Sequence, residues 1–94
     1  MIDVNEVKAI IRRFEGKEGV RGVIICDNTG LPIKSNLDID MTEEVSAYIT
    51  SLIGKGKQVV DALKEGELNF IRLETKKGEI MIALESNLIL IILK

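Results

Sequence analysis

The spacing of apolar residues changes along the chain and predicts two helices and five strands. In the first segment, apolar residues recur at steps of three and four, which predicts a helix over residues 3–15. Asp3 and Glu6 have the spacing of a capping box, and Ile2 with Val7 has that of a hydrophobic staple. These signals place the beginning of the helix at the start of the chain.

A β-hairpin is predicted next. Residues 20–26 are rich in β-branched side chains and lack polar alternation, which is typical of a strand covered on both faces. The sequence DNTG at 27–30 supplies turn residues, and residues 31–35 form the returning strand. Pro32 has no N–H to donate to a neighbouring strand, so this second strand should lie at a sheet edge.

A long second helix is predicted from about Thr42 to about Lys64, ending before Gly66. Its N-terminal cap is either Thr42 or the pair Asp40 and Glu43. At 100° per residue, one stripe of the helix should lie on the sheet. The stripe consists of Val45, Ile49, Leu52, Ile53, Gly56, Val60 and Leu63.

After the second helix the apolar period becomes two, which predicts strands at 67–75, 79–84 and 87–93. In the first of these we expect Leu68, Phe70 and Leu73 on one side and Ile71 on the other. The apolar runs mark the first and last strands as central, whereas proline and polar residues mark the second and third as edges. We therefore predict a single α+β domain over residues 1–94, of order α-β-β-α-β-β-β, with an antiparallel sheet of order 2-1-5-4-3.

Two further faces of the second helix suggest protein contacts. Tyr48 and Val59 widen the apolar surface on one shoulder only, and we expect a second copy of the chain to cover it. The alternative is that Tyr48 lies along the domain surface with its hydroxyl in water. Opposite the sheet, the small or uncharged residues Ala47, Ser51, Gly54 and Gln58 form a row that we interpret as a partner-docking surface. A glycine merely tolerated at position 54 is equally compatible with the pattern.

Composition excludes several classes of function. The 13 basic and 15 acidic residues are interspersed, which argues against a nucleic-acid footprint. The chain has no histidine and one cysteine, which excludes a Cys/His metal site and a catalytic histidine. The start of the chain lacks the apolar core of a signal peptide, and the longest apolar run, 88–93, is too short to span a bilayer. We therefore expect a cytoplasmic protein.

No catalytic, cofactor or metal site emerges from the motifs. The sequence GKGK at 54–57 lies within a predicted helix and lacks the spacing of a phosphate-binding loop. The carboxylates at 38–44 surround a helix start, where they favour the helix dipole. Cys26 ends a buried strand and is interpreted as an inert core thiol.

Two blocks of the sequence resemble the Roadblock family of dynein light chains. GVRGVIICDNTGLPIKS, residues 19–35, is similar to the hairpin of that family, and LNFIRLETKKGEIMIA, residues 68–83, is similar to its third and fourth strands. Ser51-Leu52-Ile53 followed by Lys55 fits its second helix. The resemblance covers nearly the whole chain, and the chain is most similar to the minimal prokaryotic, especially archaeal, members.

The resemblance implies a homodimer formed through the second helix and the third strand, without catalysis. The implied interface residues are Tyr48, Leu52, Val59, Leu68, Phe70 and Arg72. The chain departs from many relatives in having Ala83-Leu84-Glu85 after the fourth strand and no third helix after the fifth. One face of the sheet is therefore expected to be less covered than in those relatives.

The function implied by the resemblance is a non-catalytic dimeric module that regulates or scaffolds a Ras-like small GTPase. A subunit of a motor or scaffold complex is an alternative within the same family. A small-ligand sensor is an alternative from another class, although one tyrosine and two phenylalanines offer few aromatic groups for a ligand pocket.

Overall fold

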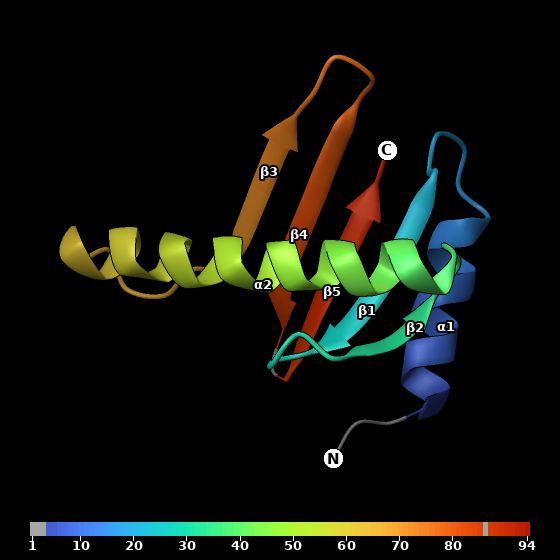
Figure 1. Ribbon diagram of the computed structural model, residues 1–94, viewed down its shortest axis with the longest axis horizontal. Coiled ribbons are helices and arrows are strands. Elements are labelled where there is room, and N and C mark those ends of the chain that lie inside the picture. The colour runs from blue at the N-terminus through green and yellow to red at the C-terminus, as the bar shows by residue number, and fades with distance from the viewer. Residues whose placement is uncertain (1–3, 86) are drawn as a thin grey trace.

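The computed structural model describes residues 4–85 and 87–94, and within them the chain forms two helices and a five-stranded antiparallel sheet (Figure 1). The elements are α1 (Val4–Glu15), β1 (Gly22–Asp27), β2 (Pro32–Ser35), α2 (Ile39–Ala62), β3 (Phe70–Glu74), β4 (Glu79–Glu85) and β5 (Leu88–Leu93). The predicted α+β class and element order are confirmed. The predicted capping box and staple involve residues 2 and 3, which lie outside the described residues.

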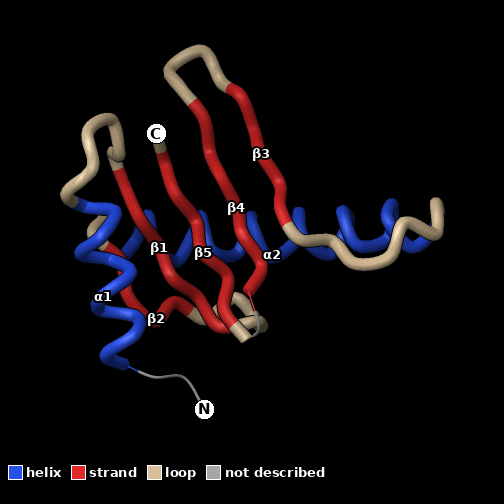
Figure 2. Tube along the Cα trace, turned by 180° about the vertical axis from the view of Figure 1, so that it is seen from behind, coloured by secondary structure: helices blue, strands red, loops and turns tan. Residues whose placement is uncertain are grey.

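The strand order is β2-β1-β5-β4-β3, as predicted, and every neighbouring pair is antiparallel (Figure 2). Strands β1 and β5 pair in the interior of the sheet, with Ile24 opposite Ile91 and Ile25 opposite Leu90. Successive side chains of a strand point to opposite faces. Both faces of these two strands therefore need a cover.

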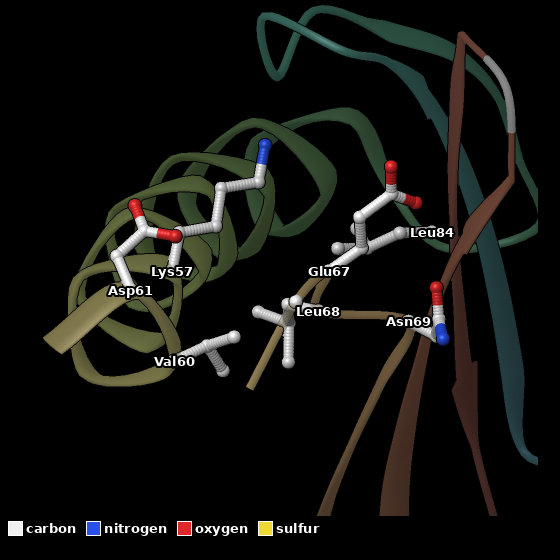
Figure 3. A pocket seen from close by; sticks show the side chains of 8 residues that line it. Lys57, Val60, Asp61, Glu67, Leu68, Asn69 and Leu84 are labelled. Carbon is white, nitrogen blue, oxygen red and sulfur yellow. The ribbon is translucent and has the colours of Figure 1, made fainter. Parts of the chain in front are cut away.

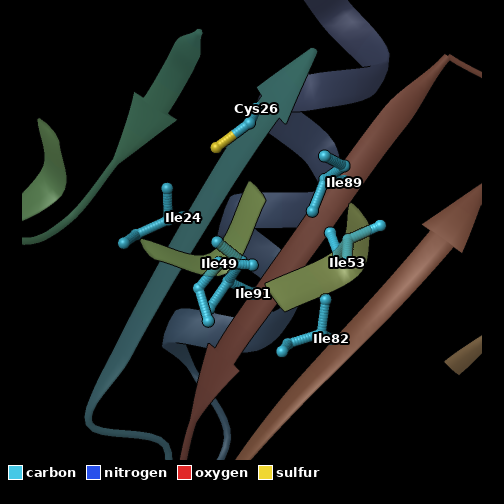
Figure 4. Packing of buried hydrophobic residues seen from close by; sticks show 7 residues of the cluster. All are labelled: Ile24, Cys26, Ile49, Ile53, Ile82, Ile89 and Ile91. Atoms are coloured by element: carbon cyan, nitrogen blue, oxygen red, sulfur yellow. The ribbon is translucent and has the colours of Figure 1, made fainter. Parts of the chain in front are cut away.

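The main core lies between α2 and the sheet. Ile49 and Ile53 of α2 point at buried residues of β1, β4 and β5 (Figure 4). The buried members of this cluster are Ile24, Cys26, Ile49, Ile53, Ile82, Ile89 and Ile91. Burying these side chains supplies much of the free energy that holds α2 in place.

A second, smaller core lies on the opposite face of the sheet under α1. Val7 and Ile11 of α1 pack against Val23 and Ile25 of β1. Figure 2 shows α1 over the β1 and β2 side of the sheet, away from β3. On β3, Phe70 is about half-exposed on this less covered face.

The turn between β1 and β2 is fixed by one carboxylate. Asp27 Oδ1 accepts hydrogen bonds from Thr29 N at 2.9 Å, Thr29 Oγ1 at 2.7 Å and Leu31 N at 3.0 Å. Gly30 adopts φ +92°, which residues with a side chain rarely adopt. The DNTG motif therefore forms a tight turn, as predicted.

Helix α2 begins earlier than predicted. Asp38 is its N-cap, with Oδ1 accepting from Met41 N at 2.8 Å, so the prediction of Thr42 or Asp40 as cap was wrong. Thr42 is instead buried, and its hydroxyl donates to Ser35 Oγ at 2.8 Å. Thr42 therefore lies within α2, hydrogen-bonded to β2, and is not the residue that caps the helix.

Strand β3 begins at Phe70, three residues later than predicted. Leu68 precedes the strand and packs beside α2, where a Cβ added to Gly56 would lie 3.1 Å from Leu68 Cδ2. Gly56, predicted to lie on the sheet-facing stripe, therefore faces Leu68 and Ile71 closely. The prediction that Phe70 and Leu73 share a face was wrong, since Phe70 is exposed while Ile71 and Leu73 face α2 and are partly buried.

Neither helix in the described ranges combines the length and the apolar character that a membrane span requires.

Candidate interaction surface

A narrow buried line fixes the orientation of α2. It consists of Thr42, Ser46, Ile49 and Ile53. Cys26 Sγ donates to Ser46 Oγ at 3.3 Å, so a polar contact joins the helix to β1 inside the core. Hydrophobic periodicity located Ile49 and Ile53 but missed the two polar members, which are buried because each has a hydrogen-bond partner.

One flank of α2 exposes large apolar side chains, which we call the apolar shoulder: Met41, Tyr48, Val59 and Leu63. Tyr48 is 67% exposed, Val59 58% and Leu63 67%. Leu52 is half-buried behind them and packs on the main core. The prediction that Leu63 lies on the sheet was wrong. Leu63 is the C-cap of α2 and is exposed, and the C-terminal part of this helix extends beyond the sheet edge (Figure 1).

Strand β3 has one open edge. It pairs with β4, and within the described chain no strand pairs with its other side. Arg72 is exposed, and its Nε donates to Glu79 Oε2 at 2.6 Å while Nη2 lies 3.1 Å from Glu74 Oε1. These pairs hold the Arg72 side chain on the sheet surface. The backbone groups of the outer edge are left available to another strand.

The C-terminal part of α2 extends past β3 in both views of the chain (Figures 1 and 2). The end of the apolar shoulder and the open edge of β3 therefore meet on one side of the molecule. Of the predicted interface residues, Val59 lies in this end of α2, and Tyr48 and Leu52 lie nearer its middle. Phe70 and Arg72 of β3 point to the sheet face away from α2, so a shared interface stays a prediction. Leu68 lies between the two elements, against α2.

The predicted docking residues Ala47, Ser51, Gly54 and Gln58 are all exposed on α2. A Cβ added to Gly54 would meet no atom within 4 Å. Packing inside the described part of the chain thus gives no reason for a glycine there. A docking role for this row stays a prediction.

The flank of α2 opposite the shoulder is hollowed, which the sequence did not indicate. Three hollows follow one another between α2 and the sheet. Figure 3 shows the one near the C-terminus of the helix, where Val60 and Leu68 face each other and Lys57 and Glu67 stand at the rim. Another lies beside the β1–β2 turn, between Leu31, 65% exposed, and Ile39, 72% exposed. In the sequence, two apolar residues could have indicated this hollow: Leu31, which follows the turn, and Ile39, which begins the helix.

The single cysteine of the chain is buried in the main core. Burial raises the pKa of the Cys26 thiol; the Ser46 hydrogen bond lowers it by less than burial raises it, and the nearby charge of Asp27 makes the smallest contribution, a further rise. A buried, protonated thiol is a poor nucleophile. Groups of three or more acidic or cysteine side chains that could hold a metal are absent from residues 4–85 and 87–94.

Comparison with known proteins adds a family and several structural relatives. The family model of the Roadblock/LC7 domain matches residues 6–94. The Roadblock/LC7 domain from Streptomyces avermitilis has a TM-score of 0.78 at 15% identity, over 97% of this chain and 77% of that one. MglB of Myxococcus xanthus has a TM-score of 0.83 at 17% identity, over 97% and 76%. The gliding protein MglB of Thermus thermophilus has a TM-score of 0.81 at 7% identity, over 98% and 74%. At these identities the structural likeness shows a shared fold.

Proposed function

The chain belongs to the Roadblock/LC7 domain family, and from this premise we propose that it is a homodimeric, non-catalytic module that regulates or scaffolds a Ras-like small GTPase. The GTPase partner follows from the resemblance of the chain to the prokaryotic members of the family. A solved MglB structure described as having a tetrameric arrangement, of TM-score 0.81, supports assembly as a property of this fold. The proposal places the protein in the cytoplasm, where such a partner acts.

The observation that carries the dimer is the position of α2 relative to β3. The C-terminal end of the apolar shoulder and the open edge of β3 lie on the same side of the chain, where α2 extends beyond the sheet. A two-fold axis beside β3 would pair the two β3 edges and bring each extended helix end over the other copy. One surface then binds itself, which is the form of interface that a closed dimer requires.

The charges along α2 favour an antiparallel second copy of the helix. Outside the hollowed flank, its first half carries Asp40 and Glu44, whereas Lys55 lies in the second half. None of these three has an ion pair within the described residues. In an antiparallel pair, the acidic half of one helix lies beside the basic half of the other.

In the proposed dimer, the row from Ala47 to Gln58 lies on the outer surface of the helix pair. Because the axis generates two copies of the row, a broad surface of small side chains is presented on one face of the dimer. Small residues allow a partner to approach the helix backbone closely. We assign GTPase docking to this surface, with Gly54 and Gln58 near its centre.

The experiment that tests the proposed function measures binding of the purified chain to Ras-like GTPases of its source organism, loaded with GDP or with a non-hydrolysable GTP analogue. Isothermal titration calorimetry should show binding that depends on the nucleotide. The rate of GTP hydrolysis, measured with and without the chain, separates a regulator from a tether. Absence of binding to every such GTPase in both nucleotide states would contradict the proposal.

A further inference from the structure

The flank of α2 opposite the apolar shoulder borders one continuous groove. The hollow beside Leu31 and the hollow beside Gly54 share Thr50 as a lining residue. The hollow beside Gly54 and the one in Figure 3 share Lys57 and Leu84. The groove thus follows α2 between the helix and the ends of β1, β4 and β5, on the side away from the proposed dimer axis.

The first part of the groove is a large apolar hollow of about 730 Å³. Leu31 and Pro32 form one wall and Ile39 and Ala47 the other. The wall formed by the turn is fixed in place, because a Cβ at Gly30 would overlap the side chain of Thr50. Two exposed apolar rims around a rigid hollow suit a large apolar side chain of a partner.

Each of the first two hollows is lined by one charged residue, and the third adds Asp61 and Glu67 beside Lys57. Glu43 is the charged residue that lines the apolar hollow, and within the described residues it has no ion pair. Further along, Lys57 lines the next hollow, of about 250 Å³, and it also lacks a carboxylate partner among those residues. Figure 3 shows the ammonium group of Lys57 at the rim of the groove rather than turned toward Asp61. An acidic and a basic group of this kind are each available to an opposite charge on a ligand.

We propose that this groove binds an extended segment of a partner protein that carries a basic residue next to a large apolar residue, followed by a carboxylate. The apolar side chain fills the hollow between Leu31 and Ile39, the basic residue pairs with Glu43, and the carboxylate pairs with Lys57. Ala47 and Lys57 are ten residues apart in α2, or about 15 Å along the helix axis. An extended chain covers that distance in about four or five residues.

Gly54 fits this arrangement. It lines the groove between the two anchoring points, and a Cβ there would project into open space rather than into the protein. Without a side chain, the helix surface at this point leaves room for the backbone of the bound segment. The proposal extends the docking role of α2 and rests on the proposed function only for the existence of a protein partner.

The test is an NMR titration of the ¹⁵N-labelled full chain with synthetic peptides. The probe peptide has Lys-Leu followed by Ser and Gly spacers and a Glu about five residues after the leucine. The control peptide has the same composition with Glu directly after Leu. We expect saturable shifts of the Gly30, Leu31 and Gly54 amides with the probe, and binding weaker by about fivefold or more with the control.

A charge reversal tests the pairing at Lys57. Lys57→Glu should weaken binding of the probe about fivefold, and a probe with Lys in place of Glu should restore it. Lys76→Glu, the same change in the β3–β4 turn far from the groove, should leave binding unchanged. Equal binding of probe and control peptides, no binding of the probe, or shifts confined to β3 would each overturn the proposal.

Measuring GTPase binding and probe binding on the same chain separates this proposal from the proposed function. If GTPases bind the chain but the probe does not, the groove proposal fails alone. If the probe binds in the groove and no Ras-like GTPase binds, the proposed function fails alone and the groove serves another protein.

Discussion

The two flanks of α2 offer different kinds of surface. One is the apolar shoulder, where Tyr48 and Val59 are exposed on a convex helix side that leads to the open edge of β3. The other is the groove, where Glu43 and Lys57 line successive hollows and have no ion pair within the described residues. An exposed apolar strip beside an unpaired strand edge suits a second copy, which presents the same strip. A hollow with separated charges suits a chain of different sequence.

The difference shows how one amphipathic helix can serve two contacts. The buried line of Thr42, Ser46, Ile49 and Ile53 is narrow, so both flanks remain at the surface. Polar members of this line contact β1 and β2 rather than solvent. The rotation of α2 about its own axis therefore decides which residues face a second copy and which face the groove.

The largest effect on stability is expected from a change in the buried line of α2, which lies between the two flanks. Ile53→Ala removes a buried side chain from the main core and should lower the free energy of unfolding by about 2–5 kcal/mol. Urea unfolding followed by circular dichroism measures it. Gly54→Ala, the next residue but exposed, is the control and should stabilise the helix by up to about 1 kcal/mol. A loss below about 1 kcal/mol for Ile53→Ala would show that α2 is not held by this line.

The next effect is expected from breaking the proposed dimer interface. Tyr48→Asp combined with Phe70→Asp places two charges in the proposed interface. At about 2 kcal/mol for each anchoring residue, the dimer dissociation constant should rise roughly 1000-fold. Sedimentation velocity measures association, and circular dichroism checks that the chain is folded. Gln58→Asp on the outer row should leave the dimer intact. A folded double variant that still dimerises would place the interface elsewhere.

A smaller effect separates partner docking from dimerisation. Gly54→Arg adds a long side chain to the outer row and the groove rim, so GTPase binding should weaken by roughly tenfold, the cost of a poorly accommodated contact of about 1.4 kcal/mol. The dimer should persist, and monomer stability should rise by up to about 1 kcal/mol because glycine disfavours helix. Calorimetric titration and light scattering give the two readouts. Unchanged GTPase affinity would remove this row from the docking surface.

The smallest effect concerns the turn that forms one wall of the groove. Hydrogen bonds from the Thr29 hydroxyl and then from the Leu31 and Thr29 backbone hold the pKa of Asp27 below its ordinary value. A lowered pKa in the folded state stabilises the protein above the ordinary pKa of the carboxyl group. This contribution is lost as the pH falls through the lowered value.

Asp27→Asn should therefore give a shallower loss of stability in acid than the original chain. The Leu31 amide resonance, followed by NMR during acid titration, should report the turn opening in the original chain before the shoulder changes. If both proteins lose the same stability as the pH falls, Asp27 does not hold this wall of the groove.

Much of the fold could be predicted because its signals are local. The β-branched run around Ile24, the turn residues from Asp27 and the period of two after Gly66 determined the strands and their order. The cap at Asp38 and the late start of β3 were missed because tertiary contacts decide them. The hydroxyl of Thr42 donates a hydrogen bond to Ser35 of β2, and Leu68 packs against α2 at Gly56.

The candidate surfaces were predicted unevenly for a related reason. Exposure of Tyr48 and Gly54 follows from their angle on the helix, which the sequence contains. The groove depends on the distance between α2 and the β1–β2 turn, a contact between Gly30 and Thr50 that no local pattern encodes. Leu63 was misplaced because the sequence does not show where the sheet ends beneath the helix.

In the proposed dimer, the apolar shoulder and the β3 edge bind a second copy of the chain. The most direct test of this dimer is the molar mass of the purified protein, measured by light scattering coupled to size-exclusion chromatography over a range of concentrations. A dimer should have about twice the chain mass of 10.4 kDa. A mass of one chain at every concentration, with the protein folded, would contradict the proposal.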